Sequence, residues 1–372
     1  MYVKTLSYLL AVLVFLTGCS QGGSLSTTTT SSSTYASSLS SVLQKTYKEY
    51  DLSGALLAIK FKDGSIFIDS IGYADRLKKL PLKTTQQFRI GSTTKTITAT
   101  AILLLYEQGF LSLDDSVISL LPEFKNSLDS DITVRMLLNH TSGIEDYIGC
   151  PYKDTLLFYF LAENPKLQWE PKELVDIGIA CDDGDLSKNS FLYSNTNYIL
   201  LGMIIESISK KSYEEYTENN IFSTLNLKKT SFPTTNGFSN EFARGYYERY
   251  KDGVLYDYTI QSPSSTWAAG GAISTPLELL AWAEVFGEGH LLDKTTQKEQ
   301  LEYVDMGEGA KYGLGMLIQD DGTIGHNGTV FGYQTQMFYK DGISIVIYTN
   351  SYYQSKDNPT FTTYKDVASI IF

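Results

Sequence analysis

A Ser-x-x-Lys spacing at the start of an apolar helical pattern constrains this chain more than any other feature. Ser92 and Lys95 precede residues 96–108, which form an apolar helix pattern, and Gly109 follows as a residue suited to a helix C-terminus. The spacing places Ser92 at the helix N-terminus and Lys95 one turn further along the same face. The positive end of the helix dipole favours an alkoxide on the serine and the neutral form of the lysine. A serine whose proton is within reach of such an amine is a candidate nucleophile.

A structural interpretation of this stretch remains open at this point. Serine is a favoured N-cap residue, and Lys95 would then be a solvated residue of the first turn. The same spacing recurs at Ser207 and Lys210 inside another helical pattern, where we interpret it as chance. The first copy therefore gains weight from other motifs of the chain.

Length, charge and composition limit the classes of function. The chain has 372 residues, 42% hydrophobic and 19% charged, which is typical of a globular protein with a sizeable core. Its formal net charge is −12 and no basic cluster is interleaved with aromatic residues, so nucleic acid is not expected as a partner. The three histidines are scattered and no phosphate-loop glycine pattern stands out, so no metal or other cofactor is expected.

The N-terminus has the features of an export signal. Residues 1–19 contain an apolar stretch at 9–16 that is too short to span a membrane, and they end in Leu-Thr-Gly-Cys19. This ending resembles a bacterial lipobox, which implies that Cys19 is lipidated and becomes the mature N-terminus. An ordinary secretory peptide with a chance cysteine is the alternative. We expect a lipid-anchored protein of the bacterial cell envelope, in which the Ser/Thr-rich residues 20–41 form a flexible tether.

The two remaining cysteines form an even pair. Cys150 and Cys181 would lie in an oxidising compartment, where such a pair is commonly bonded. We expect a disulfide between them, although the sequence itself gives no distance.

Strand signals occur near both ends of the chain, and helical signals dominate between them. Residues 54–61 and 65–73 are β-rich runs joined through an Asp-Gly turn, which predicts a hairpin. Short β runs return within residues 312–350, after a helix that begins at Pro276.

This order predicts an α+β fold, an α/β sandwich. One antiparallel sheet made from both chain ends would be covered by helices, and an all-helical lobe, about residues 110–250, would be inserted. Residues 42–372 would then form one domain. The site would lie between the sheet and the lobe, where pockets commonly form.

A Tyr-x-Asn motif precedes one of the clearest helical patterns. A tyrosine phenol that nearby ammonium groups deprotonate can serve as a general base, which is the role considered for Tyr193. The amide of Asn195 would orient Lys95 and the substrate carbonyl. A packed tyrosine and an N-cap asparagine are the structural alternative.

A third motif lies on a predicted edge strand and contains His326, Gly328 and Thr329. Gly328 would let the strand approach a substrate closely, and the backbone N–H of Thr329 would pair with that of Ser92 as an oxyanion hole. The alternative for His326 is a lone surface imidazole.

In this order the three motifs resemble those of the serine β-lactamase and penicillin-binding-protein superfamily. The branch of class C β-lactamases, D-alanyl-D-alanine carboxypeptidases and related esterases is the more similar one, because it has Tyr-x-Asn as its second motif. The resemblance spans residues 41–372 and includes residues 137–143 around His140, which we interpret as a structural loop at a helix end. It implies the β-lactamase/transpeptidase-like fold.

The resemblance also implies a serine hydrolase that acts through an acyl-enzyme. Ser92 would be the acylated nucleophile, Lys95 its proton partner, and Tyr193 the base for acylation and deacylation. Asn195 would orient the substrate, which would be a cell-wall peptide, a β-lactam or an ester. Carboxypeptidase-like and esterase-like activities fit this branch of the superfamily.

The third motif departs from the class C pattern. His326 would stand where many relatives have lysine, and Asn327 replaces the threonine hydroxyl that would help to hold a substrate carboxylate. A neutral histidine supplies less fixed charge than lysine, so efficient β-lactamase action is not expected.

A catalytically silent lipoprotein of the same fold, which binds peptidoglycan or a partner, is the alternative hypothesis. The presence of Ser92, Lys95 and Tyr193 together argues against it, since a binding module has no need for all three. The sequence leaves the substrate and the oligomeric state open.

Overall fold

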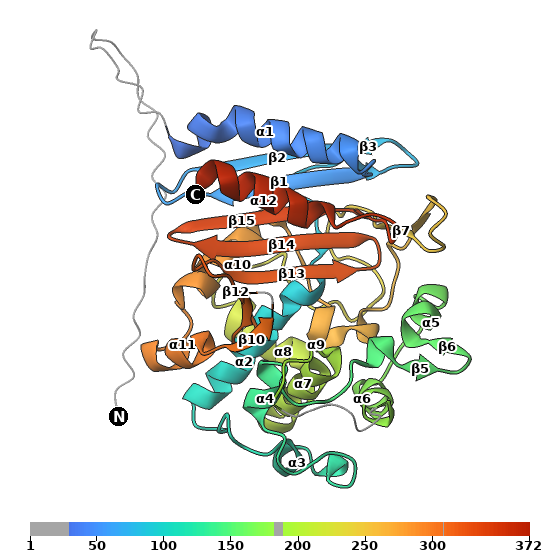
Figure 1. The fold of residues 1–372 in the computed structure, drawn as a ribbon, viewed down its shortest axis with the longest axis vertical. Coiled ribbons are helices and arrows are strands. Elements are labelled where there is room, and N and C mark those ends of the chain that lie inside the picture. Colours follow the sequence, from blue (N-terminus) through green and yellow to red (C-terminus); the bar gives the residue numbers. More distant parts are fainter. Residues whose placement is uncertain (1–29, 182–188, 308) are drawn as a thin grey trace.

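An antiparallel sheet built from both ends of the chain forms one half of the molecule (Figure 1). The computed structural model describes residues 30–181, 189–307 and 309–372. Within these residues the order of neighbouring strands is β10 (Val304–Gly307), β11 (Ala310–Tyr312), β12 (Leu317–Ile318), β13 (Ile324–Val330), β14 (Tyr333–Lys340), β15 (Ile343–Thr349), β1 (Gly54–Lys60), β2 (Ile66–Asp75) and β3 (Leu80–Pro81).

The predicted hairpin corresponds to β1 and β2, which pair with Leu57 opposite Asp69. On its other side β1 pairs with β15, where Leu57 lies opposite Ile347. A strand with partners on both sides and helices over both faces has buried side chains in both directions, as β1 does. The prediction of one sheet that joins the two chain ends is confirmed.

Helices cover both faces of this sheet. α1 (Ser31–Glu49) and α12 (Pro359–Ile371) pack against each other on one face, while α10 (Pro276–Glu288) lies behind the sheet in Figure 1. Alternate residues of β1 accordingly enter two separate cores: Leu57 packs with the α1 side and Leu56 with the α10 side. α10 starts at Pro276 as predicted, with Thr275 as its N-cap.

The predicted tether is wrong for residues 31–41, because they form the first part of α1. Leu39 and Leu43 are buried against the sheet and α12, and the hydroxyl of Thr30 accepts a hydrogen bond from Ser33 N as the helix N-cap. Packing of this apolar stripe outweighs the low helix propensity of the serines and threonines. The signal peptide, Cys19 and tether residues 20–29 lie outside the described residues.

The second half of the molecule is a mainly helical lobe below the sheet in Figure 1. α7 (Asn195–Ser209) runs through its centre and is buried on most sides, in contact with α2, α4, α6 and α9. The helices of the lobe and of the segments beside it are α2 (Thr94–Glu107), α3 (Val117–Leu120), α4 (Val134–Leu138), α5 (Leu157–Glu163), α6 (Pro171–Ala180), α8 (Tyr213–Thr217), α9 (Trp267–Gly270) and α11 (Lys294–Leu301).

The lobe is not entirely helical. A two-residue pair, β5 (Pro151–Tyr152) and β6 (Thr155–Leu156), lies near α5, and β7 (Tyr246–Glu248) pairs with β8 (Leu255–Asp257) and β16 (Ser351–Tyr352). Strands of two or three residues are too short to produce the alternation that a sequence pattern would reveal. None of the helices in the described part of the chain combines the length and apolar character that a membrane crossing requires.

Candidate active site

Ser92 lies at the junction between the sheet and the lobe, in a short 3₁₀ turn, η1 (Gly91–Thr93), that leads directly into α2. The regular helix therefore starts two residues after Ser92, and Gly109 ends it with a positive φ of 73° as predicted. The Gly109 amide donates to Tyr106 O and the next amide to Leu105 O, which forms a Schellman motif. Ser92 is half-buried, whereas Lys95 is completely buried.

The Lys95 amine is surrounded by three oxygen atoms. Nζ lies 3.2 Å from Ser92 Oγ, 2.6 Å from Asn195 Oδ1 and 2.8 Å from the carbonyl oxygen of Ala269. Burial lowers the pKa of Lys95 to about 7, and the Asp146 carboxylate opposes this effect. A substantial fraction of Lys95 is therefore neutral near neutral pH.

In the neutral amine these contacts leave a free electron pair for Ser92. A neutral lysine has two N–H groups and one lone pair, and a carbonyl oxygen can only accept a hydrogen bond. Asn195 and Ala269 therefore take both N–H groups, and the lone pair is left for the hydroxyl of Ser92, which can donate. This is the geometry of a general base beside its nucleophile.

Tyr193 precedes α7, and its aromatic ring lies next to the Lys95 amine. The centre of its ring is 4.9 Å from Lys95 Nζ. Burial raises the pKa of the Tyr193 phenol, and a hydrogen bond with Ser92 offsets only part of this rise. The expectation that nearby ammonium groups deprotonate Tyr193 is therefore not met in the resting site. Desolvation is the largest cause of this rise, the charge of Asp146 adds to it, and Lys95, the neighbouring amine, is itself partly neutral.

Asn195 is the first residue of α7, whose N-cap is Ser194. Asn195 Nδ2 donates to Asp146 Oδ2 at 2.9 Å, so one side-chain amide connects Lys95 to a carboxylate. Burial raises the pKa of Asp146, while hydrogen bonds from Ile148 and Asn195 and the charge of Lys95 lower it. Sequence reasoning missed Asp146, because a single acidic residue on a loop looks like any solvated charge.

His326 belongs to this cluster but is not a surface imidazole. It is 1% exposed, its Nε2 accepts from the hydroxyl of Tyr312 at 2.9 Å, and its Nδ1 donates to the carbonyl oxygen of Asn327. Burial and then the charge of Lys95 lower its pKa to about 3, so the ring is neutral. Both ring nitrogens are used within the protein, and a bound anion would meet no fixed positive charge here.

The strand that carries His326 is an edge over only part of its length. β13 pairs with β14 throughout and with β12 at Ile324 and Gly325. Beyond Gly325 its free side faces η1 within the described residues. A Cβ on Gly328 would overlap the carbonyl oxygen of Ile90 and lie 3.1 Å from Ser92 N, and a Cβ on Gly91 would lie 2.7 Å from Thr329 N.

The backbone amides of Ser92 and Thr329 thus flank one close junction between two glycine-containing segments. The predicted oxyanion hole requires both amides to point to one substrate oxygen beside Ser92 Oγ. The pairing of these two amides on a substrate oxygen stays a prediction.

His140 supports the Tyr193 segment. It follows α4 in a left-handed conformation with φ of 60°, and its ring centre lies 4.4 Å from that of Tyr193. Its Nδ1 accepts from Ser194 N at 3.1 Å, and burial keeps its pKa well below the usual range. These contacts agree with a structural part for His140 at a helix end.

Comparison with known proteins identifies the family. The model of the Beta-lactamase family matches residues 39–368. This chain belongs to the β-lactamase family. It is 28% identical to penicillin-binding protein 4* of Bacillus subtilis over 338 residues, which cover 82% of this chain and 69% of that protein. It is 32% identical to protein flp of Staphylococcus aureus over 212 residues, which cover 56% of this chain and 40% of flp.

Solved structures agree with the family. A D-stereospecific amidohydrolase from Streptomyces sp. superimposes with a TM-score of 0.77 at 27% identity, over 87% of this chain and 97% of that one. The β-lactamase/transpeptidase-like fold predicted from the motifs is therefore confirmed, and the chain is a serine hydrolase of the β-lactamase and penicillin-binding-protein family.

In this β-lactamase family member a disulfide links the loop that carries Asp146 to α6. Cys150 and Cys181 are bonded, as expected from the cysteine count, with Cα atoms 5.7 Å apart. The bond joins the end of η3 (Tyr147–Gly149) to the end of α6. Asp146 itself caps η3 by accepting from Ile148 N.

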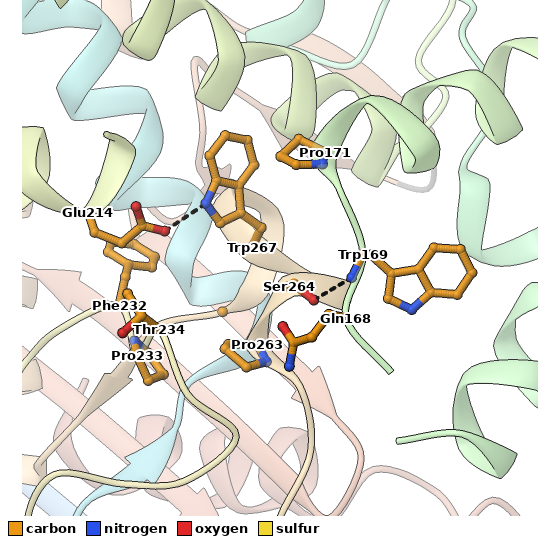
Figure 2. A pocket seen from close by; sticks show the side chains of 11 residues that line it. Gln168, Trp169, Pro171, Glu214, Phe232, Pro233, Thr234, Pro263, Ser264 and Trp267 are labelled. Carbon is orange, nitrogen blue, oxygen red and sulfur yellow. Dashed lines mark hydrogen bonds between the residues drawn. The ribbon is translucent and has the colours of Figure 1, made fainter. Parts of the chain in front are cut away.

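A separate cavity of about 210 Å³ is lined in part by Trp169 and by Trp267 of α9 (Figure 2). Its lining includes Glu214 and Trp267, which are joined by a hydrogen bond from the indole N–H, together with Phe232 and several prolines. Its lining does not include Ser92, Lys95 or Tyr193, but Trp267 belongs to α9, as does the carbonyl that accepts from Lys95. Within the described residues, no group of three or more His, Cys, Asp or Glu side chains could hold a metal ion.

Proposed function

We propose that this chain cleaves an ester or amide through an acyl-enzyme on Ser92, with an activity like that of the D-alanyl-D-alanine carboxypeptidases or esterases of its family. The observation that carries the proposal is the environment of Lys95. Two carbonyl acceptors take its N–H groups, its pKa falls to about 7, and Ser92 Oγ lies 3.2 Å away. A binding module has no need for an amine held in this state.

The proposed reaction has two halves. Lys95 Nζ takes the hydroxyl proton as Ser92 Oγ attacks the substrate carbonyl carbon, and the new oxyanion lies toward the amides of Ser92 and Thr329. The leaving amine or alcohol receives a proton through the protonated phenol of Tyr193, which Lys95 reprotonates. Water then attacks the carbonyl carbon of the acyl-enzyme and gives a proton to Tyr193 and Lys95. These groups return the proton to Ser92 Oγ as the ester bond breaks, which releases the acid and free Ser92.

The names of relatives support an acyl-transfer reaction. The Bacillus subtilis relative is a penicillin-binding protein, and the Streptomyces enzyme is a D-stereospecific amidohydrolase. The neutral state of His326 favours substrates that do not depend on a fixed positive charge at this position. Among the candidate substrates this ranks esters and amides without a carboxylate at that position above cephalosporins and above peptides that end in a free carboxylate.

Side-by-side hydrolysis of three substrates tests the proposal. Wild-type protein and the variant Ser92→Ala would be given a short-chain ester, a peptide ending in D-Ala-D-Ala, and a cephalosporin. We expect turnover of the ester, slower turnover of the peptide and of the cephalosporin, which both carry a carboxylate, and loss of all hydrolysis in Ser92→Ala. Absence of turnover on all three, with binding of peptidoglycan fragments retained, would favour the silent binding protein instead.

We also propose that the protein is anchored to the bacterial cell envelope by a lipid on Cys19. The support is the apolar stretch followed by Leu-Thr-Gly-Cys. Mass spectrometry of the N-terminal peptide should find a diacylglyceryl group on Cys19, and Cys19→Ser should remove the protein from the membrane fraction. An unmodified Cys19 in the mature protein would contradict the anchor.

A further inference from the structure

The side-chain amide of Asn195 is held at both of its ends. Its Oδ1 accepts from Lys95 Nζ at 2.6 Å, and its Nδ2 donates to Asp146 Oδ2 at 2.9 Å. If the amide turned by 180°, its oxygen would face the carboxylate, and two acceptors would meet. The carboxylate therefore selects one of the two amide orientations.

This selection matters most when Lys95 is neutral. The lone pair of a neutral amine accepts hydrogen bonds, so an unrestrained Asn195 amide could turn and donate its N–H₂ to Lys95. Lys95 would then have no electron pair for the proton of Ser92. With the amide nitrogen fixed on a carboxylate, Lys95 must donate to Asn195 and keeps its lone pair for the serine.

We propose that Asp146 is a positioning residue of this site, which fixes the Asn195 amide and thereby keeps the Lys95 lone pair directed at Ser92. The inference rests on the proposed function. Asp146 acts through Asn195, since its carboxylate accepts hydrogen bonds from Asn195 Nδ2 and from the backbone amide of Ile148.

The surroundings hold this carboxylate in place. Asp146 Oδ1 accepts from Ile148 N at 3.2 Å, and the Cys150 sulfur lies 3.3 Å from the Asp146 carbonyl oxygen. The neighbouring Tyr147 is fully buried, with its hydroxyl donating to Ser265 O at 2.7 Å. The position of the carboxylate is thus set by the disulfide-linked η3 segment and not by a mobile surface loop.

Asp146 also supplies the negative charge that acts on Lys95. Among the described residues, the titratable groups that face Lys95 are Asp146 at the N-cap of η3, Tyr193 just before α7, Tyr198 on α7, His140 after α4 and His326 on β13. Burial lowers the pKa of both histidines and raises the pKa of both tyrosines, so these four groups are neutral near pH 7. Removal of the Asp146 charge should therefore move the pKa of Lys95 further down.

The test uses Asp146→Asn and a second variant, Asp146→Ser. The asparagine in the first variant would have one acceptor oxygen for two donors, Ile148 N–H and Asn195 Nδ2, whereas the carboxylate has two. Serine is a favoured N-cap and preserves the cap of η3, but it is too short to reach Asn195. Glu145→Gln is the matched control, because it removes the same charge one residue away.

Two readouts separate positioning from folding. The first is the rate of Ser92 acylation by an activated ester as a function of pH. The second is the pH at which the ε-carbon signal of Lys95 titrates in lysine-labelled protein, assigned by its loss in Lys95→Arg, and this readout requires no turnover. Thermal unfolding of each variant reports any loss of structure.

We expect Asp146→Asn and Asp146→Ser to acylate on the order of 10²-fold more slowly, the effect of a misplaced reacting group. In both, the Lys95 titration should move to lower pH, while Glu145→Gln should match wild type. Wild-type acylation rates and a wild-type Lys95 titration in both variants would overturn the inference. Slower acylation with an unchanged Lys95 titration and a lower unfolding temperature would also overturn it, because a loss of structure would then explain the slower rate. If wild-type protein does not acylate, the proposed function fails, and an unchanged Lys95 titration in both Asp146 variants would still overturn the inference about Asp146.

Discussion

The acylation rate of Ser92 should depend on pH through Lys95. Because burial lowers the pKa of Lys95 to about 7, about one tenth of the amine is neutral at pH 6 and about nine tenths at pH 8. The neutral amine is the proton acceptor, so kcat/KM for an activated ester should rise about tenfold between pH 6 and pH 8 and then level off.

The two histidines and Tyr193 cannot produce this rise. The pKa of His326 is lowered to about 3 and that of His140 lies well below its usual range, whereas the pKa of Tyr193 is raised. The assay is stopped-flow release of nitrophenol from pH 5 to pH 9, corrected with Ser92→Ala for spontaneous hydrolysis. A flat profile between pH 6 and pH 8, or a rate that falls over this range, would refute the assignment of Lys95 as the base.

Three substitutions test other parts of the site and its support. Tyr193→Phe should lower kcat by about 10²–10⁴-fold, the usual span for a proton-transfer group, and its unfolding temperature should stay near that of wild type. Steady-state kinetics that show less than a fivefold loss would contradict a role of Tyr193 in proton transfer. Gly328→Ala should abolish acylation, because its Cβ would overlap Ile90 O and force β13 away from the turn that holds Ser92, whereas the exposed Asn327→Ala should acylate normally. Cys181→Ala should cost about 3–4 kcal/mol of unfolding free energy, as expected for a bond that spans 31 residues, and an unchanged urea midpoint would show that the bond is absent in solution.

Local patterns in the sequence predicted much of the fold. The Asp-Gly turn predicted the β1–β2 hairpin, and the apolar run closed by Gly109 predicted α2 and its end. Both depend on neighbours within a few residues, which a sequence pattern records directly. The first part of α1 was missed because its stabilising contacts come from the sheet and from α12, which is more than 300 residues away, and not from its own sequence neighbours.

In the site, too, contacts between sequence neighbours were predictable, whereas long-range contacts were not. The spacing of Ser92 and Lys95 is a property of one helical turn, so their contact was predictable. Asp146 approaches Asn195 from a segment 49 residues earlier, and nothing in its own neighbourhood marks that contact. The neutral state of His326 and the high pKa of Tyr193 follow from burial, which a sequence does not record for a polar residue.

The mass of the intact protein after reaction with an activated ester or a fluorescent penicillin tests the central claim most directly. The account predicts one added acyl group on wild-type protein, mapped by peptide sequencing to Ser92, and no added mass on Ser92→Ala. An adduct on another residue, or equal labelling of Ser92→Ala, would contradict the claim that Ser92 is the nucleophile.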